Sequence, residues 1–365
     1  MDHRLLSHKF RHSFHLSDKA LAWLQSYLEG RLQRVVVNGK CSEWTKVKSG
    51  TPEGGLLSPL MFTMFINDLP LEIVKSSVLM FADDVKLYKK IDSPSDVADL
   101  QSDLDKLSMW SKTWKLTLNP GKCKHFRMTL KKQPVVGSYS IDNTVLDYVS
   151  EIRDLGVILD EKLTFGPHID KCVKKANRAL GLLFISFQKV GRGGYFNLSS
   201  VKVSYYAHVR SVLEYGSVIW AGAAKTHLDR IERIQHKFLL WLDYQSRTTS
   251  RSLNYLDLLQ NVMMTSLNSR RCQHDLLFLR NIFRGRIDSP VLLSMFSLSA
   301  PLRLGRHTQL INVPFGRVSS VMNGLFIRLP RMMNEYADKC QASDMFHDTL
   351  YSFRTAVVNY VRHMP

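Results

Sequence analysis

The sequence predicts an α+β fold, with hairpins and short strands in the first part of the chain and helices in the rest. Two observations predict strands. The turn pair Asn38-Gly39 separates runs of β-formers, and the stretch from Val78 to Tyr88 has too many β-formers on each arm to be a helix. A third observation predicts the helices, because apolar residues recur every three or four positions in most segments after about Pro167. We therefore expect a domain change near residue 165.

The first part of the chain is expected to form an antiparallel sheet with packed helices. In order, we expect a helix from Ser17 to Leu28, a hairpin with arms Arg34–Val37 and Trp44–Val47, a loop at 50–55, an apolar helix from Leu56 to Leu69, the hairpin Val78–Tyr88, a helix opened by Ser93-Pro94, and strands at Cys123–Met128 and Arg153–Leu159. The helix after Pro94 carries one apolar stripe, at Val97, Leu100, Leu104, Leu107, Trp110 and Trp114.

The second part of the chain is expected to be mostly helical. The predicted helices are Ile169–Phe187, Val201–Trp220, Leu228–Trp241 and Leu253–Ile282. Gly191-Arg192-Gly193-Gly194 and the polar stretch from Gln245 to Ser252 are the predicted hinges.

Composition favours an intracellular protein with a polyanionic partner. The chain has 365 residues, and its 50 Lys and Arg against 32 Asp and Glu give a net charge of +18, spread along the sequence. No apolar run approaches the roughly 20 residues that span a bilayer, and the first residues lack a signal-peptide core. The five cysteines show no paired spacing. We expect nucleic acid as the partner, no membrane segment, no secretion, and a nuclear or cytoplasmic location.

Asp83 and Asp84 are the strongest candidates for a functional site. They lie inside the apolar stretch from Val78 to Tyr88, where buried carboxylates are costly unless a cation lies between them. A divalent metal is the predicted cation, and oxygen ligands of this type favour Mg²⁺. The alternative for an isolated Asp pair is a solvated turn.

The motifs around this pair resemble the reverse transcriptases of non-LTR retrotransposons, particularly the jockey-like elements. The resemblance lies in four ordered stretches: Gly50-Thr51-Pro52-Glu53-Gly54-Gly55 with the apolar helix and Asn67-Asp68-Leu69-Pro70 after it, Phe81-Ala82-Asp83-Asp84, Leu118-Asn119-Pro120-Gly121-Lys122, and Leu155-Gly156-Val157. It covers roughly residues 2 to 190, and parts of the region around Arg270 and Pro290 also look like such elements.

The resemblance implies an RNA-directed DNA polymerase, a nucleotidyltransferase that uses two metal ions. It implies a partial polymerase palm at 1–165, a helical thumb at 166–245 and a helical C-terminal region of unknown role at 246–365. The implied partners are an RNA template, a DNA primer and, if the chain is active, deoxynucleoside triphosphates, with Mg²⁺ as cofactor; the oligomeric state stays open. The implied site residues are Asp83 and Asp84 for catalysis and metal, Gly50, Pro52, Glu53, Gly54, Gly55 and Lys122 for nucleotide and template positioning, Leu155, Gly156 and Val157 for the primer grip, and Lys171, Lys174, Lys175 and Arg178 for the nucleic-acid backbone.

Three departures from the family pattern leave alternatives open. Position 53 is Glu where the family usually has Gln, and position 55 is Gly where it usually has Ser. The first catalytic aspartate of the family would precede Met1, and Asp2 is a poor substitute for it. We therefore expect a truncated enzyme that is inactive alone. The alternatives are a retroelement-derived protein that binds RNA or an RNA-DNA hybrid without chemistry and, ranked lower, a group II intron maturase.

Overall fold

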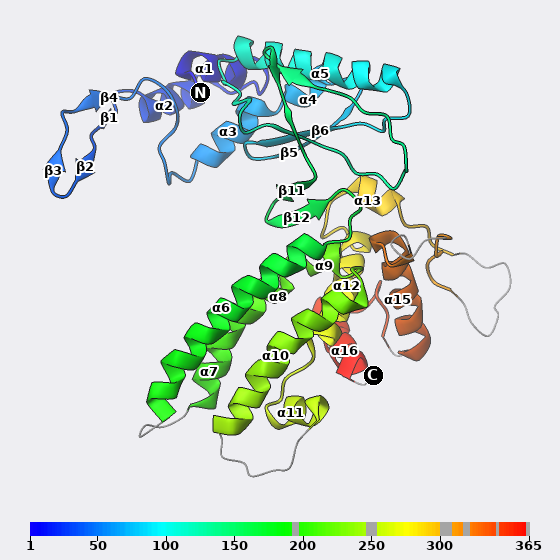
Figure 1. Ribbon diagram of the computed structural model, residues 1–365. Helices are drawn as coiled ribbons and strands as arrows, with labels where there is room; N and C mark the ends of the chain where they lie inside the picture. The colour runs from blue at the N-terminus through cyan, green and yellow to red at the C-terminus, as the bar shows by residue number, and fades with distance from the viewer. Residues whose placement is uncertain (192–196, 246–253, 300–308, 317–321, 341–342, 363–365) are drawn as a thin grey trace. The chain divides into compact units, whose positions relative to one another are not determined.

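The computed structural model divides the chain into two compact units. It describes residues 1–191, 197–245, 254–299, 309–316, 322–340 and 343–362. Unit 1 comprises Met1–Ser150 and unit 2 comprises Glu151–Pro365 (Figure 1). The division falls earlier in the chain than the domain change predicted near residue 165. The assignment of palm, thumb and C-terminal region to three segments stays a prediction.

Unit 1 combines helices with two-stranded sheets. Its helices are α1 (His3–His12), α2 (Asp18–Leu28), α3 (Ser58–Ile66), α4 (Leu69–Glu72) and α5 (Pro94–Thr113). Its strands are β1 (Leu32–Gln33), β2 (Val36–Val37), β3 (Lys40–Cys41), β4 (Thr45–Lys46), β5 (Ser77–Phe81), β6 (Asp84–Tyr88), β7 (Lys124–Phe126), β8 (Ser140–Ile141), β9 (Thr144–Val145) and β10 (Asp147–Val149). In the part of the chain that the structure describes, strands pair only in twos, and the pair of β7 with β10 is parallel.

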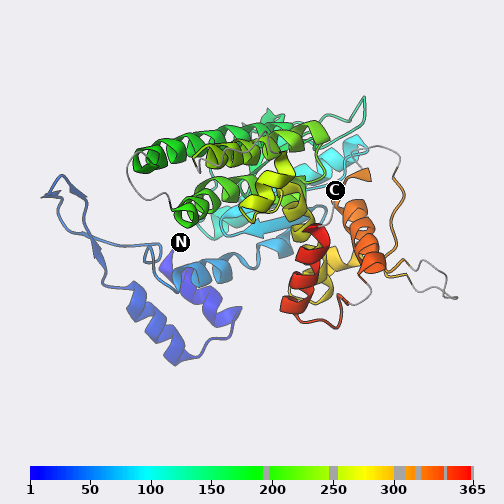
Figure 2. The same cartoon turned by 90° about the horizontal axis from the view of Figure 1, so that it is seen from below.

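Local sequence signals account for several of these elements. Ser17 accepts a hydrogen bond from the backbone of α2, and Ser93 forms a capping box with Asp96 at the start of α5. Asn38 and Gly39 both have positive φ, as the predicted two-residue turn requires. They connect β2 to β3, which form a hairpin (Figure 1, Figure 2). The predicted stripe of α5 packs into the core of unit 1 through six apolar residues, Val97, Leu100, Leu104, Leu107, Trp110 and Trp114.

The apolar helix predicted from Leu56 to Leu69 is wrong in its bounds. The structure has α3 over Ser58–Ile66 and a separate short helix, α4, over Leu69–Glu72. Leu56 and Leu57 precede α3 in a turn, and proline follows the start of both helices. Since proline is tolerated in the first turn of a helix but not in its interior, Pro59 and Pro70 each mark a new start.

A buried carboxylate fixes the segment that leads into β5. Asp103 of α5 is fully buried and accepts hydrogen bonds from the backbone nitrogens of Lys75 at 2.8 Å and Ser76 at 2.7 Å. The Ser76 hydroxyl also donates to it at 2.7 Å. Burial opposes ionisation of Asp103, but these hydrogen bonds outweigh it and lower the pKa to about 2.

Changing Asp103 to Asn is expected to lower the free energy of unfolding by roughly 2 kcal/mol, because an amide presents only one acceptor oxygen to these donors. The folded-state pKa of Asp103 is depressed from 3.8, so this stabilisation is present above about pH 4 and is lost as the pH falls toward about 2. Urea unfolding of the wild-type chain and the D103N variant at about pH 7 and about pH 3 measures the gap. A gap that stays the same at both pH values would contradict the role of Asp103.

Unit 2 is mostly helical after one hairpin. The hairpin consists of β11 (Glu151–Asp154) and β12 (Val157–Asp160). The helices are α6 (Gly166–Gly191), α7 (Leu198–Tyr205), the π-helix η1 (Tyr206–Arg210), α8 (Ser211–Glu214), α9 (Ser217–Trp220), α10 (Lys225–Gln245), α11 (Tyr255–Asn261), α12 (Leu267–Phe283), α13 (Pro290–Ser294), α15 (Leu325–Lys339) and α16 (Leu350–Arg362).

The predicted helices of unit 2 are confirmed as helical regions, with two interruptions. Gly216, at φ 63°, ends the helical run that begins at Leu198, so α9 is separate from α8. Residues 262–266 separate α11 from α12 within the helix predicted from Leu253 to Ile282. Apart from Gly191, the hinge at Gly191–Gly194 lies outside the described residues, as does the hinge predicted at Gln245–Ser252 from residue 246 onward.

Candidate functional site

Asp83 and Asp84 lie at the tip of a tight hairpin. β5 and β6 pair antiparallel, and the last pair of the ladder is Phe81 with Asp84, so Ala82 and Asp83 form a two-residue turn. Ala82 has a positive φ of 51°, but Asp83 does not have a positive φ. The turn is therefore not of type I′, in which both central residues have positive φ. The predicted hairpin is therefore confirmed, and the two carboxylates project from adjacent positions at its end.

The expectation that these two acids lie buried among apolar residues is wrong. Both side chains are exposed. Val78, Met80, Val85 and Leu87 are the hairpin residues that pack on the core of unit 1, and they lie on one face of the ladder. The tip extends past that contact, so burial does not require a cation there. The carboxylates make no hydrogen bond or ion pair with other described residues, which leaves their oxygens free for a ligand.

The structure shows which acids do not join this pair. Within the described residues, no group of three or more His, Cys, Asp or Glu side chains is placed to hold a metal ion. Asp2 caps α1 by accepting hydrogen bonds from Arg4 and Leu5, and it pairs with Lys115 at 3.1 Å. The hydrogen bond from Lys115 is the main cause of the lowered pKa of Asp2. Asp2 thus serves the start of a helix.

The glycine-rich loop at 50–55 needs its glycines for its own conformation. Gly50 and Gly54 have φ of 81° and 74°, values that other residues rarely adopt. At Gly55 a Cβ would lie 2.7 Å from the Tyr27 hydroxyl, so the serine usual in the family could not enter here without a shift of Tyr27. The loop is joined to α1 by a hydrogen bond of 2.7 Å between the His3 ring and the Gly50 carbonyl.

Of the other predicted positioning residues of unit 1, Glu53 and Lys122 are exposed and Pro52 is half-buried. Glu53 lies exposed in the loop, and Pro52 accepts a hydrogen bond from the Ser58 hydroxyl at 2.5 Å. Lys122 is exposed in the turn before β7. In the described part of the chain, no hydrogen bond or ion pair connects Lys122 or Glu53 to Asp83. Glu53, Lys122 and Asp83 are therefore exposed in the same unit, and the convergence of the positioning residues on one ligand stays a prediction.

The predicted primer-grip residues lie in the turn of the hairpin of unit 2 and at the first position of β12. Leu155 and Gly156 have φ of 42° and 93° between β11 and β12, and Val157 is buried in the core. The Tyr215 hydroxyl donates to the Leu155 carbonyl at 2.7 Å, and a Cβ on Gly156 would lie 2.9 Å from its ring. Tyr215, which holds this turn in place, was not among the predicted site residues. In the sequence, the feature that marks the position of Tyr215 is the Gly216 that follows it.

The four basic residues predicted to contact nucleic acid are exposed along α6. Lys171, Lys174, Lys175 and Arg178 are exposed, at intervals that place them on one side of the helix. None of the four has a carboxylate partner among the described residues. Asp170 of the same helix pairs instead with Arg230 of α10.

Unit 1 also contains a buried cation that was not predicted. Lys9 of α1 is 1% exposed, and its ammonium group donates to the Phe65 carbonyl and the Asp68 carboxylate at 2.5 Å each. It also lies over the rings of Trp110 and Trp114, at 4.7 and 3.7 Å from the centroids. Asp68 belongs to the motif Asn67-Asp68-Leu69-Pro70, so this motif has a structural role. In the sequence, this burial is indicated by the position of Lys9 next to Phe10, on the apolar side of α1.

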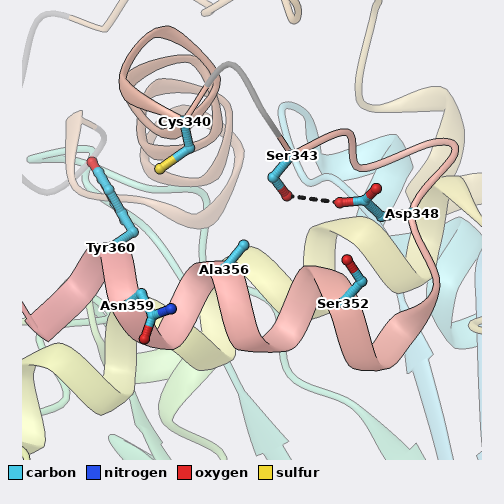
Figure 3. A pocket seen from close by; sticks show the side chains of 7 residues that line it. All are labelled: Cys340, Ser343, Asp348, Ser352, Ala356, Asn359 and Tyr360. Carbon is cyan, nitrogen blue, oxygen red and sulfur yellow. Dashed lines mark hydrogen bonds between the residues drawn. The ribbon is translucent and has the colours of Figure 1, made fainter.

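A pocket of about 440 Å³ lies near the C-terminal end of unit 2, away from every predicted site residue in the sequence (Figure 3). The Ser343 hydroxyl donates to the Asp348 carboxylate at 2.9 Å on its wall. The lining residues are Cys340, Ser343, Asp348, Ser352, Ala356, Asn359 and Tyr360.

Comparison with known proteins assigns the part of the chain that carries these motifs. Residues 2–159 match the family described as reverse transcriptase (RNA-dependent DNA polymerase). This segment belongs to the reverse transcriptase family. It includes the hairpin tip with Asp83 and Asp84, the glycine-rich loop and Lys122, so the predicted resemblance is confirmed.

The relatives are polymerases of non-LTR retrotransposons. The chain is 31% identical over 227 residues to the probable RNA-directed DNA polymerase from transposon BS of Drosophila melanogaster, which covers 59% of this chain and 24% of that protein. It is 29% identical over 219 residues to the probable polymerase from transposon X-element of the same species, covering 59% and 24%. It is 28% identical over 232 residues to the RNA-directed DNA polymerase from mobile element jockey of Drosophila funebris, covering 61% and 25%.

These matches define what the chain contains. The reverse transcriptase domain is of the type found in non-LTR retrotransposon polymerases, and the chain spans about a quarter of the length of the relatives it matches. No solved structure matches the chain significantly. Among the described residues, no helix has both the length and the apolar character needed to cross a membrane.

Proposed function

We propose that the reverse transcriptase domain of this chain serves RNA-directed DNA synthesis, with Asp83 and Asp84 as metal-binding catalytic residues. The observation that carries the proposal is the pair of free, adjacent carboxylates at a hairpin tip inside the segment that matches the family. Carboxylate oxygens are the ligands that Mg²⁺ prefers, so the residues fit the metal. Bound metal ions would activate the primer hydroxyl and stabilise the departing pyrophosphate.

The other predicted residues have roles that their positions support. The loop residues Gly50, Pro52, Glu53, Gly54 and Gly55 would position template and nucleotide, and Lys122 would offset the charge of the incoming triphosphate. The turn residues Leu155 and Gly156, with Val157 at the start of β12, would hold the primer. The basic residues of α6 would bind the nucleic-acid backbone as part of a thumb. Exposed, unpaired cations suit that role, because they need not leave another partner to bind a phosphate.

We also propose that the 365-residue chain does not polymerise by itself. Two metal ions need bridging carboxylates, and the hairpin tip provides two neighbouring acids with no third acid beside them among the described residues. The second candidate function is binding of RNA or an RNA-DNA hybrid without chemistry. The exposed basic row on α6 favours it, because that row can act without the carboxylates.

Changing Asp83 to Ala is expected to reduce polymerase activity at least a hundredfold. This corresponds to a rise in activation free energy of roughly 3 kcal/mol or more. The measurement is Mg²⁺-dependent extension of a DNA primer on an RNA template. It uses a chimera in which residues 2–159 replace the matching segment of the transposon BS polymerase. Changing the exposed Lys19 to Ala in the same chimera is the matched control and should leave extension unchanged.

Three results would count against these proposals. Full extension by the D83A chimera, or a folded wild-type chimera without extension, would contradict the polymerase role and favour the binding function. Mg²⁺-dependent extension by the 365-residue chain alone, lost in its D83A variant, would contradict the proposal that this chain is inactive by itself.

A further inference from the structure

Helices α6 and α10 of unit 2 lie side by side and run in the same direction. Near their starts, Arg230 of α10 pairs with Asp170 of α6. Near their ends, the rings of Phe184 and Trp241 stack with centroids 4.8 Å apart. Contacts that pair start with start and end with end require a parallel arrangement (Figure 1).

The exposed sides of the two helices form one continuous face. When α6 is viewed along its axis, its buried positions, such as Ala176 and Leu180, are rotated in one direction from the positions that touch α10. When α10 is viewed in the same way, its buried positions, such as Phe238 and Leu242, are rotated in the opposite direction from the positions that touch α6. In a parallel pair both buried sides therefore lie below the contact and both exposed sides above it.

We call this exposed surface the α6–α10 face. It consists of Lys171, Lys174, Lys175, Arg178, Leu182 and Ile185 on α6, and Arg233, Lys237, Leu240 and Tyr244 on α10.

One end of the α6–α10 face is basic. Arg233 and Lys237 of α10 add two exposed cations to the four of α6. None of the six pairs with a carboxylate among the described residues. Asp229 is exposed on α10, and Asp170 of α6 is already paired with Arg230. A surface of this kind favours a polyanion.

The other end of the face is apolar. Leu182 and Ile185 are 67% and 59% exposed, and Leu240 and Tyr244 are 49% and 80% exposed. These residues follow the cations toward the C-terminus on both helices. Because the helices are parallel, the basic halves lie together at one end and the apolar halves lie together at the other.

We propose that the α6–α10 face binds an unpaired strand of nucleic acid, with phosphates on the basic end and bases on the apolar end. A duplex presents phosphates and sugars to a helical surface and keeps its bases stacked inside, so it could neutralise the cations but would leave the apolar end uncovered. An unpaired strand presents phosphates and bases together, and bases stack on side chains such as Tyr244. The inference rests on the proposed function in taking nucleic acid as the partner, and it names the strand that this surface takes.

The test measures binding of the full chain to fluorescent 20-nucleotide oligouridine and to an RNA-DNA hybrid of equal length, by anisotropy at several salt concentrations. We expect tighter binding of the single strand. Replacing Lys174 and Lys237 by Gln should reduce the salt slope of single-strand binding by about 1.4, from about 0.7 per lost phosphate contact. Tyr244→Ala should weaken single-strand binding roughly tenfold and leave the salt slope unchanged. Tyr244 is 80% exposed, so its removal should not affect folding.

The matched control replaces Arg354 and Arg362 of α16, also exposed, by Gln and should change neither quantity. The inference is overturned if the hybrid binds as tightly as the single strand, if Tyr244→Ala has no effect, or if the control pair lowers the slope equally. Binding needs neither Mg²⁺ nor Asp83. Lost extension with retained strand preference would therefore count against the polymerase role alone, and the reverse result against the α6–α10 face alone.

Discussion

Changing Asp68 to Ala is expected to lower the free energy of unfolding of the wild-type chain by about 3 kcal/mol, because it leaves the Lys9 ammonium buried without its counter-charge. Burial is the main cause that lowers the pKa of Lys9, and the hydrogen bond from Lys9 to Asp68 opposes it. In the variant only the Phe65 carbonyl and the neighbouring rings would remain as partners for the ammonium group.

Urea unfolding followed by tryptophan fluorescence measures this effect, since Trp110 and Trp114 surround the ammonium group. A Lys9→Met variant should lose less stability than D68A, because Asp68 is 31% exposed and water can solvate it once Lys9 is gone. The exposed Lys19→Ala control should change stability by no more than about 0.5 kcal/mol. A D68A variant as stable as this control would show that the Lys9 contact contributes nothing.

Changing Arg328 to Met is expected to destabilise unit 2 by about 3 to 5 kcal/mol. Arg328 donates to the Asp275 carboxylate at 2.8 and 3.3 Å, and it also donates to the carbonyls of Val218 and Asn323. It therefore ties α12, α9 and the start of α15 together. Asp275 is 1% exposed, so the variant would leave a buried carboxylate without its main partner.

The pH dependence of this loss separates charge from packing. Burial raises the pKa of Asp275, and Arg328 and Arg271 oppose that rise. Without Arg328 the folded-state pKa of Asp275 should rise further, so the variant loses stability as the pH increases from about 4. Unfolding at about pH 4 and about pH 8 should therefore show the larger deficit at the higher pH. An equal loss of stability at both pH values would mean that lost packing alone explains the effect. The control is Arg354→Ala, a change at an exposed arginine.

Short-range signals predicted much of the fold. The turn at Asn38-Gly39, the helix start at Ser93-Pro94 and the stripe on α5 depend on φ preferences and spacing along one element, and the structure has all three. The single helix predicted from Leu56 to Leu69 has the wrong bounds, because the apolar run is continuous whereas Pro59 and Pro70 mark two separate helix starts.

The candidate site was predictable in its residues but not in its environment. Asp83 and Asp84 lie at a hairpin tip as predicted, yet both are exposed, because burial depends on where the core of unit 1 ends. Tyr215 lies 60 positions after the turn of Leu155 that it supports, and a local pattern carries no signal for such a contact.

The amino-acid order alone determined the membership of residues 2–159 in the reverse transcriptase family, since motif identity and spacing are properties of the chain. Only the tertiary structure decided that Lys9 is buried against Asp68, and that the basic residues of α6 and α10 share one face. The reason is physical: burial, ion pairing and the alignment of two helices depend on contacts between residues far apart in sequence, and those contacts exist only after the chain has packed.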